Sequence, residues 1–122
     1  MNAVVKKVLR IQQAARKSGF DWPDAHAVID KVKEELDELS QALRLKDKAA
    51  IQDEFGDVLL VVSNLSLHLA LGMEACLSQA LEKFNRRYQE MLRQSYNKTI
   101  DFESLTLEEK ECLWCDAKKV VG

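Results

Sequence analysis

The chain has 122 residues, of which 47% are hydrophobic and 31% are charged, and its formal net charge is -2 at pH 7. This length and balance are typical of one folded globular domain, residues 1–122, and exclude a disordered chain. A charge so close to zero gives no sign of a general nucleic-acid binder or of a protein that binds anionic membranes, and no apolar run reaches the roughly 18 residues that a membrane span needs.

The first two helices are expected over residues 2–17 and 24–44. Ser18-Gly19 is a natural stop for the first helix. Pro23, in the aromatic loop F-D-W-P-D, fixes the chain direction at the start of the second. The apolar residues of the second helix recur at spacings of three and four, as on one face of a helix: Ile29, Val32, Leu36, Leu39 and Leu43.

The third and fourth helices are expected over residues 48–71 and 74–95, with Leu71-Gly72 between them. The third helix is apolar on nearly every side, because Leu59 and Leu60 point away from its main stripe of Ile51, Phe55, Val58, Val62, Leu65 and Leu69. A helix of this kind is central in the fold or covered by a partner chain. The fourth helix is expected to turn its apolar face inward: Leu77, Leu81, Phe84, Tyr88, Met91 and Leu92.

The C-terminal part is expected to form a loop over residues 96–105 and a short helix over 107–119. Thr106 and Glu109 have the spacing of a capping box at the start of this last helix. No stretch alternates like a strand. The fold class is therefore all-α, with a bundle-like core of four antiparallel helices plus the short C-terminal helix.

Two pairs of acidic residues carry the main chemical signal. On a helical wheel, Glu35 and Glu38 share one flank of the apolar stripe, whereas Glu34 points nearly away from the core. Glu54 and Asp57 form a second pair of the same spacing in the third helix. Because a short link joins the two helices, they are expected to be antiparallel neighbours, and the four carboxylates then converge.

Converging carboxylates repel one another and lose hydration, so they call for a cation. Oxygen ligands alone suit a hard ion, Mg²⁺ or Mn²⁺. For the second helix taken alone, a solvated acidic face that pairs with Lys31 and Arg44 remains the alternative. On the fourth helix, Lys83 and Arg87 form a basic flank. Next to such a metal, this flank suits the binding of phosphate. Without a metal nearby, it is more simply a solvated basic face.

The chain has three cysteines, Cys76, Cys112 and Cys115. An odd number of cysteines without an apolar leader indicates a reduced, cytoplasmic protein. The lone C-x-x-C of Cys112 and Cys115 lacks the two further ligands of a zinc site. Zinc or redox chemistry is therefore not expected.

The acidic motifs resemble those of a known enzyme family. E-E-L-D-E at residues 34–38 followed by E-F-G-D at residues 54–57 resembles the E-E-x-x-E and E-x-x-D signature of MazG-type nucleoside triphosphate pyrophosphohydrolases. G-F-D-W-P-D, K-F-N-R-R-Y and L-T-L-E-E-K-E-C-L-W also look like segments of this family. Many members carry two such domains, whereas this chain is similar to the short members with one.

The resemblance implies hydrolysis of (deoxy)nucleoside triphosphates to monophosphate and pyrophosphate, which clears non-standard or surplus nucleotides. It implies Mg²⁺, with Mn²⁺ as a substitute, on Glu35, Glu38, Glu54 and Asp57. Glu38 or Glu34 would be the general base. Lys31, Lys83 and Arg87 would contact the triphosphate. Trp114 would close over the nucleotide or else be an ordinary core residue. Trp22 or Phe20 could stack on the base, with core packing favoured for Phe20. Asn64 would have a structural role or a weak contact with the sugar or base. A homodimer or homotetramer is implied as well.

Three other interpretations stay open. A dUTPase or a phosphoribosyl-ATP pyrophosphohydrolase would share the chemistry. The latter usually has a histidine soon after its second acidic motif, and V-L-L-V-V follows Asp57 here. A di-iron bundle needs E-x-x-H pairs, which the sequence lacks. A non-catalytic helical interaction module would tolerate the loss of Glu54 or Asp57.

Overall fold

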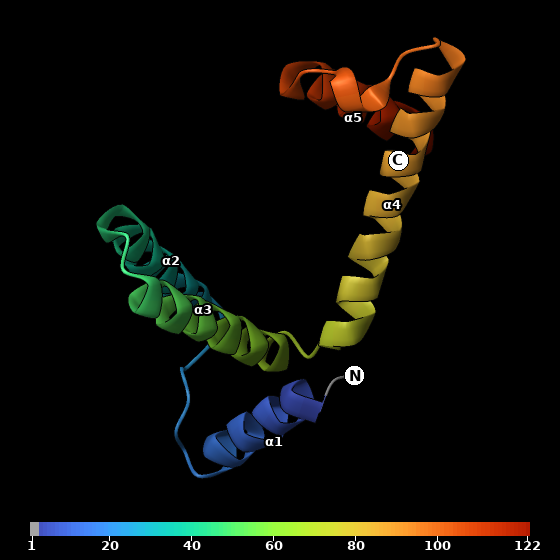
Figure 1. The fold of residues 1–122 in the computed structure, drawn as a ribbon. Coiled ribbons are helices and arrows are strands. Elements are labelled where there is room, and N and C mark those ends of the chain that lie inside the picture. The colour runs from blue at the N-terminus through green and yellow to red at the C-terminus, as the bar shows by residue number, and fades with distance from the viewer. Residues whose placement is uncertain (1–2) are drawn as a thin grey trace. The chain divides into compact units, whose positions relative to one another are not determined.

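The computed structural model of the protein describes residues 3–122, which form five α-helices and one short 3-10 helix (Figure 1). The described residues contain no strand, so the predicted all-α class is confirmed. The chain divides into two compact units, Met1–Glu74 and Ala75–Gly122, and each is described here by itself.

The first unit contains helices α1 (Ala3–Lys17), α2 (Ala25–Leu45) and α3 (Lys48–His68). Helices α2 and α3 lie side by side and antiparallel, as expected from the short link, and α3 also contacts α1 (Figure 1). Aspartates cap the two long helices, since Asp24 accepts a hydrogen bond from the backbone N–H of Ala27 at 2.8 Å and Asp47 accepts one from Ala50 at 3.1 Å. These caps fix where the two acidic helices begin.

The helix ends of this unit share one backbone geometry. One or two residues after each helix, the backbone adopts the left-handed conformation. These residues are Gly19, Lys46 and Ala70, with φ of 86°, 54° and 54°. The predicted end of α3 at residue 71 is wrong, because the helix ends at His68 and the turn is made by Ala70, not by Gly72. The N–H of Leu71 then bonds the carbonyl of Ser66 and closes the end.

The second unit holds most of α4 (Met73–Asn97), the 3-10 helix η1 (Phe102–Ser104) and α5 (Leu107–Val121). The predicted loop over residues 96–105 therefore contains a short helix, which Asp101 caps. The predicted capping box is confirmed: Thr106 Oγ1 accepts from the N–H of Glu109, and the Glu109 carboxylate accepts from the N–H of Thr106.

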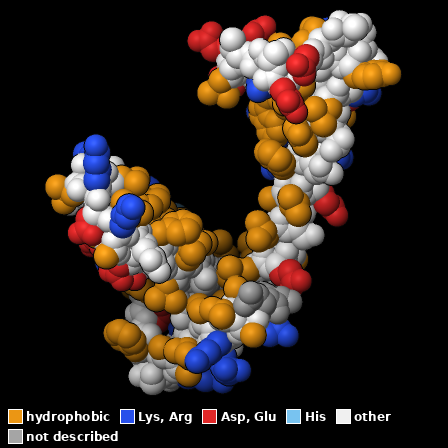
Figure 2. Space-filling view, in the orientation of Figure 1, with side chains coloured by type: hydrophobic (Ala, Val, Ile, Leu, Met, Phe, Trp, Pro, Cys, Tyr) orange, Lys and Arg blue, Asp and Glu red, His pale blue; other side chains and the backbone are white. Residues whose placement is uncertain are grey.

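The buried face of α2 is not the predicted one. Val28, Glu35 and Ala42 are its buried residues, each seven apart, whereas Leu36 and Leu43 of the predicted stripe are about half exposed. Exposed large hydrophobic residues also include members of the predicted stripes of α3 and α4: Phe55, Val62, Leu69, Leu77, Leu81, Phe84 and Tyr88. Figure 2 shows hydrophobic side chains gathered on the visible surface over α2 and α3.

The apolar content of the helices also bears on membranes. Among residues 3–122, no single helix has both the length and the hydrophobicity of a membrane span, although α3 and α4 taken together as a bent pair meet the same criteria.

Candidate functional site

The acidic residues of α2 and α3 come together in two overlapping groups that share Glu54. One carboxylate oxygen from each of Glu35, Glu38 and Glu54 lies within 4.8 Å of the others. The same holds for Asp53, Glu54 and Asp57. The structure thus brings together all four predicted metal ligands and adds Asp53, whose side chain is exposed.

Burial and mutual repulsion make this cluster electrostatically strained. The pKa of Glu54 is raised from 4.5 to about 7, chiefly because burial removes hydration from the charged form. A hydrogen bond with Glu38 and the negative charges of Glu38, Glu35 and Asp57 raise it further. Glu54 is therefore only partly ionised near neutral pH.

Two carboxylate oxygens of the cluster have no protein partner. Oε2 of Glu35 and Oε2 of Glu54 are buried and accept no hydrogen bond. Buried polar atoms in native proteins nearly always have a partner, so such atoms indicate a ligand. A divalent cation fits, because the site offers several carboxylate oxygens from two rigid helices and no sulfur or nitrogen among the clustered groups.

Lys31 places a positive charge beside this cluster. Its Nζ lies 3.1 Å from Oε1 of Glu35 and 3.2 Å from Oε1 of Glu34, and both hydrogen bonds raise the pKa of Lys31, the one to Glu35 most. Glu34 is exposed and belongs to neither carboxylate group. The structure therefore links Glu34 to the cluster through Lys31.

An open pocket of about 320 Å³ lies between α1, the loop at residues 20–22 and α3. Trp22 and Asn64, both predicted to contact substrate, line this pocket. Phe20 lines it too, although its side chain is 80% exposed, so core packing is not its role. The other lining residues are Val8, Ile11, Gln12, Ala15, Leu60 and Val61.

The polar lining of this pocket has unused hydrogen-bonding capacity. Oδ1 of Asn64 and Oε1 of Gln12 are buried without a partner, while Gln12 Nε2 donates to the carbonyl of Leu60 at 2.9 Å. Gln12 was not predicted from the sequence. Its only signal is a polar residue on the side of the first helix where Val8, Ile11 and Ala15 supply apolar groups.

The remaining predicted residues belong to the second unit. The Arg87 guanidinium lies 5.3 Å from the centre of the Trp114 ring, and its Nε donates to the carbonyl of Gly122 at 2.9 Å. Trp114 also packs against Phe84, with ring centres 5.5 Å apart. Lys83, one turn before Arg87, is exposed. Arg87 and Trp114 thus form one unit, stabilised by a cation–π contact.

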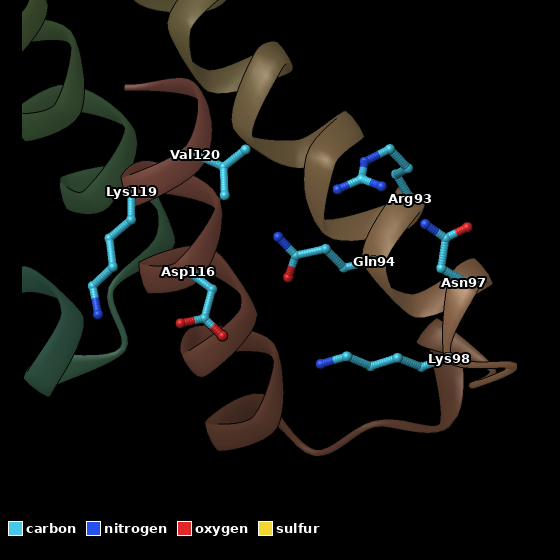
Figure 3. A pocket seen from close by; sticks show the side chains of 7 residues that line it. All are labelled: Arg93, Gln94, Asn97, Lys98, Asp116, Lys119 and Val120. Carbon is cyan, nitrogen blue, oxygen red and sulfur yellow. The ribbon is translucent and has the colours of Figure 1, made fainter.

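A second opening lies between α4 and α5 and measures about 460 Å³ (Figure 3). It is lined by seven mostly polar residues, Arg93, Gln94, Asn97, Lys98, Asp116, Lys119 and Val120. None of the predicted site residues lines it. Arg93 is also committed elsewhere, because it pairs with the buried carboxylate of Glu90.

Comparison with known proteins gives consistent matches. The sequence profile of the MazG nucleotide pyrophosphohydrolase domain matches residues 24–92. A nucleoside triphosphate pyrophosphohydrolase of Escherichia coli (strain K12) is 36% identical over 112 residues, which are 90% of this chain and 43% of that protein. A nucleoside triphosphate pyrophosphohydrolase/pyrophosphatase MazG of Thermotoga maritima is 38% identical over 109 residues, 89% of this chain and 42% of that protein. The chain spans less than half the length of these relatives.

Proposed function

Since the chain belongs to the family of MazG nucleotide pyrophosphohydrolase domains, we propose that it hydrolyses nucleoside triphosphates to nucleoside monophosphates and pyrophosphate. The observation that carries this proposal is the convergence of Glu35, Glu38 and Glu54, with Asp57 beside Glu54, in the part of the chain that matches the family. Two buried carboxylate oxygens without protein partners support the binding of a cation at this cluster.

Glu35, Glu38, Glu54 and Asp57 would hold Mg²⁺, or Mn²⁺ in its place. Bound there, the cation would polarise phosphate oxygens and lower the pKa of a bound water. The protein's own contribution is to fix the carboxylates on two antiparallel helices, so that they do not have to be ordered when the substrate arrives. Lys31, held by Glu35 and Glu34, would offer its ammonium group to a phosphate oxygen.

Glu38 is the residue that we assign as general base. It belongs to the cluster, so its carboxylate can receive a proton from a water next to the α-phosphorus. Glu34 is the alternative base, although its carboxylate is exposed and bonded to Lys31. After attack in line with the leaving group, pyrophosphate departs with its charge balanced by cationic groups.

Arg87, Lys83 and Trp114 are assigned to the substrate's phosphates and to closure over the nucleotide. The stacked arrangement of Arg87 on Trp114 supports a joint role, because the contact restrains the guanidinium. In the first unit, Trp22 and Asn64 would contact the base or sugar, since both line the pocket of about 320 Å³. A pocket of this size with aromatic walls and two free acceptor oxygens suits a nucleobase with N–H donors.

We further propose that the protein acts as a homodimer or homotetramer in the cytoplasm and removes non-standard or surplus nucleotides. The exposed apolar residues of α3, Leu59 and Leu60 among them, support an assembly that covers them. Three exposed cysteines without disulfides fit a reducing compartment.

The test is a panel of canonical and damaged triphosphates, with dUTP and phosphoribosyl-ATP included, scored for pyrophosphate release in Mg²⁺. Glu38→Gln is expected to lower turnover by a factor of about 100 or more, the usual loss when a general base is removed. Asp37→Asn, an exposed residue between the motif positions, is the matched control and is expected to retain activity.

A panel in which no triphosphate yields pyrophosphate would contradict the proposed activity. Cleavage of dUTP alone, or of phosphoribosyl-ATP alone, would replace it with the corresponding narrower enzyme. Full activity of Glu38→Gln would remove this residue from the catalytic group.

A further inference from the structure

Asp21, in the loop between α1 and α2, has no role in the proposed function, yet its carboxylate contacts several elements of the first unit. Its Oδ1 accepts hydrogen bonds from the backbone N–H of Trp22 at 2.8 Å and from Asn64 Nδ2 at 3.3 Å. Its Oδ2 lies 2.9 Å from Nε of Arg16 and 3.0 Å from Nε2 of His68. One carboxylate thus joins the end of α1, its own loop and two turns of α3.

This carboxylate is largely enclosed. The side chains of Asp21 and His68 are 13% and 8% exposed. Burial alone would raise the pKa of Asp21, but the close contact with His68 and the hydrogen bonds from Trp22 and Asn64 outweigh it, and the pKa lies below its ordinary value. Asp21 is therefore a charged acceptor at neutral pH, and bonds to a charged acceptor are the stronger kind.

Two of the residues that bond to Asp21, Trp22 and Asn64, line the pocket at α1 and α3. Phe20, the other neighbour of Asp21 in the sequence, also lines this pocket. The N–H of Phe20 bonds back to the carbonyl of Ala15 at 2.9 Å, whereas Pro23, after Trp22, offers no N–H. The bond from the Trp22 N–H to Asp21 is the one that fixes the backbone at the indole itself.

We propose that Asp21 is a positioning residue that holds Trp22 and Asn64 at the wall of the pocket and thereby sets how tightly the base portion of the substrate binds. This proposal rests on the proposed function, in which Trp22 and Asn64 contact the nucleotide. Asp21 itself touches no reacting atom. Its loss should weaken substrate binding and leave the carboxylate cluster, and so the chemical step, largely intact.

The variant Asp21→Asn keeps the size of the side chain and removes its charge. With the triphosphate that the wild type cleaves fastest, we expect KM to rise about tenfold to a hundredfold and kcat to change less than about threefold, since small displacements of binding groups are costly. The matched control is Asp24→Asn in the same loop, because asparagine is as good a helix cap as aspartate and Asp24 does not line this pocket.

A readout that is independent of activity is the motion of Trp22. In a Trp114→Phe background, Trp22 is the sole tryptophan. The decay of its fluorescence anisotropy should gain a fast local component in Asp21→Asn and remain unchanged in Asp24→Asn. A variant that only loosened the fold would raise local motion without the separation of KM from kcat.

The proposal is overturned if Asp21→Asn has the same KM and the same anisotropy decay as Asp24→Asn, or if kcat falls while KM stays constant. If Asp21→Asn fails to fold by circular dichroism, Arg16→Gln and His68→Gln each remove one partner, and an unchanged KM in both overturns it. A wild type that releases no pyrophosphate contradicts the proposed function, and the anisotropy decay alone then decides whether Asp21 fixes Trp22.

Discussion

Glu35 occupies a position at which a soluble helix normally has an apolar residue. It lies in line with Val28 and Ala42 on the buried face of α2 and is only 6% exposed. One of its oxygens pairs with Lys31 and the other has no partner. Keeping a charged group there costs free energy unless a cation or substrate repays it. The residue therefore makes sense as part of a site and not as part of the core.

The raised pKa of Glu54 predicts how stability depends on pH in the absence of metal. Between its ordinary pKa of 4.5 and its folded value of about 7, the folded protein binds more protons at Glu54 than the unfolded chain does. The contribution of Glu54 is therefore fully favourable below about pH 4.5 and is lost as the pH rises through 7. Thermal unfolding of the wild type and of Glu54→Gln from pH 5 to 8, with a chelator present, should show a wild-type melting temperature that falls relative to the variant.

Mg²⁺ supplies the control for this prediction. The cation competes with the proton for the carboxylate, so it should raise the melting temperature of the wild type more at pH 8 than at pH 5.5 and have a much smaller effect on Glu54→Gln. Parallel pH profiles of the two proteins would contradict the raised pKa.

Glu90 does not affect this comparison between pH 5 and 8. Arg93 and Gln94 lower the pKa of Glu90 to about 2, so its contribution to stability is lost only as the pH falls below 4.5.

The sequence identified the acidic residues of the site better than its polar pocket residues. A spacing of three places two acids on one flank of a helix, and this was sufficient to group Glu35 and Glu38 with Glu54. Gln12 and Asp21 were missed because their contacts cross from one element to another. Helical periodicity gives the face of a residue but not the side chain that it meets across a loop.

The sequence was sufficient to predict which helices exist and in what order, but it did not always predict where a helix ends. Three helices end with a left-handed residue that is not glycine: Lys46, Ala70 and Thr99. Glycine is the usual signal for this geometry, and it is present at Gly19 and Gly122. The predicted end of α3 was placed at the glycine at position 72, whereas the left-handed turn lies at Ala70.

Ala70→Gly tests the strain at this turn. An L-residue in the left-handed region costs free energy, which glycine avoids, and part of the gain is lost because glycine makes the unfolded chain more flexible. We expect Ala70→Gly to raise the free energy of unfolding by about 0.5–1 kcal/mol. Chemical denaturation measures this change.

Ala14→Gly is the control for Ala70→Gly, because Ala14 is an exposed residue within α1 with ordinary helical geometry. There the same substitution should lower the free energy of unfolding by about 1 kcal/mol. Equal destabilisation at both positions would show that the turn at Ala70 carries no strain.

The buried face of α2 could not be read from its pattern alone. The spacing of its leucines places the apolar centre near Leu36, but the neighbouring helix α3 covers the line of Val28, Glu35 and Ala42 instead. A helical face predicted from periodicity is defined by its apolar residues, so a buried glutamate is not predicted. The prediction failed there because a glutamate occupies the middle of the buried line.

For the whole molecule, the exposed apolar surface predicts self-association. Leu59 is 53% exposed on α3, and Leu60 and Val62 beside it are also exposed. Sedimentation of the wild type should give a dimer or tetramer. Leu59→Glu should weaken this association by about 3 kcal/mol or more, since a symmetric interface loses two buried leucines.

Leu107→Glu is the comparison variant for association. Leu107 is 72% exposed at the start of α5, where a glutamate suits the helix dipole. This variant should sediment like the wild type. A wild type that remains monomeric over the micromolar range would contradict the proposed assembly.

The central claim is that the carboxylate cluster directs water to the α-phosphorus of a nucleoside triphosphate. Hydrolysis in ¹⁸O-labelled water, followed by mass spectrometry of the products, tests it most directly. We expect one ¹⁸O atom in the phosphate of the nucleoside monophosphate and none in pyrophosphate. Label in pyrophosphate, or release of inorganic phosphate with a nucleoside diphosphate, would contradict it.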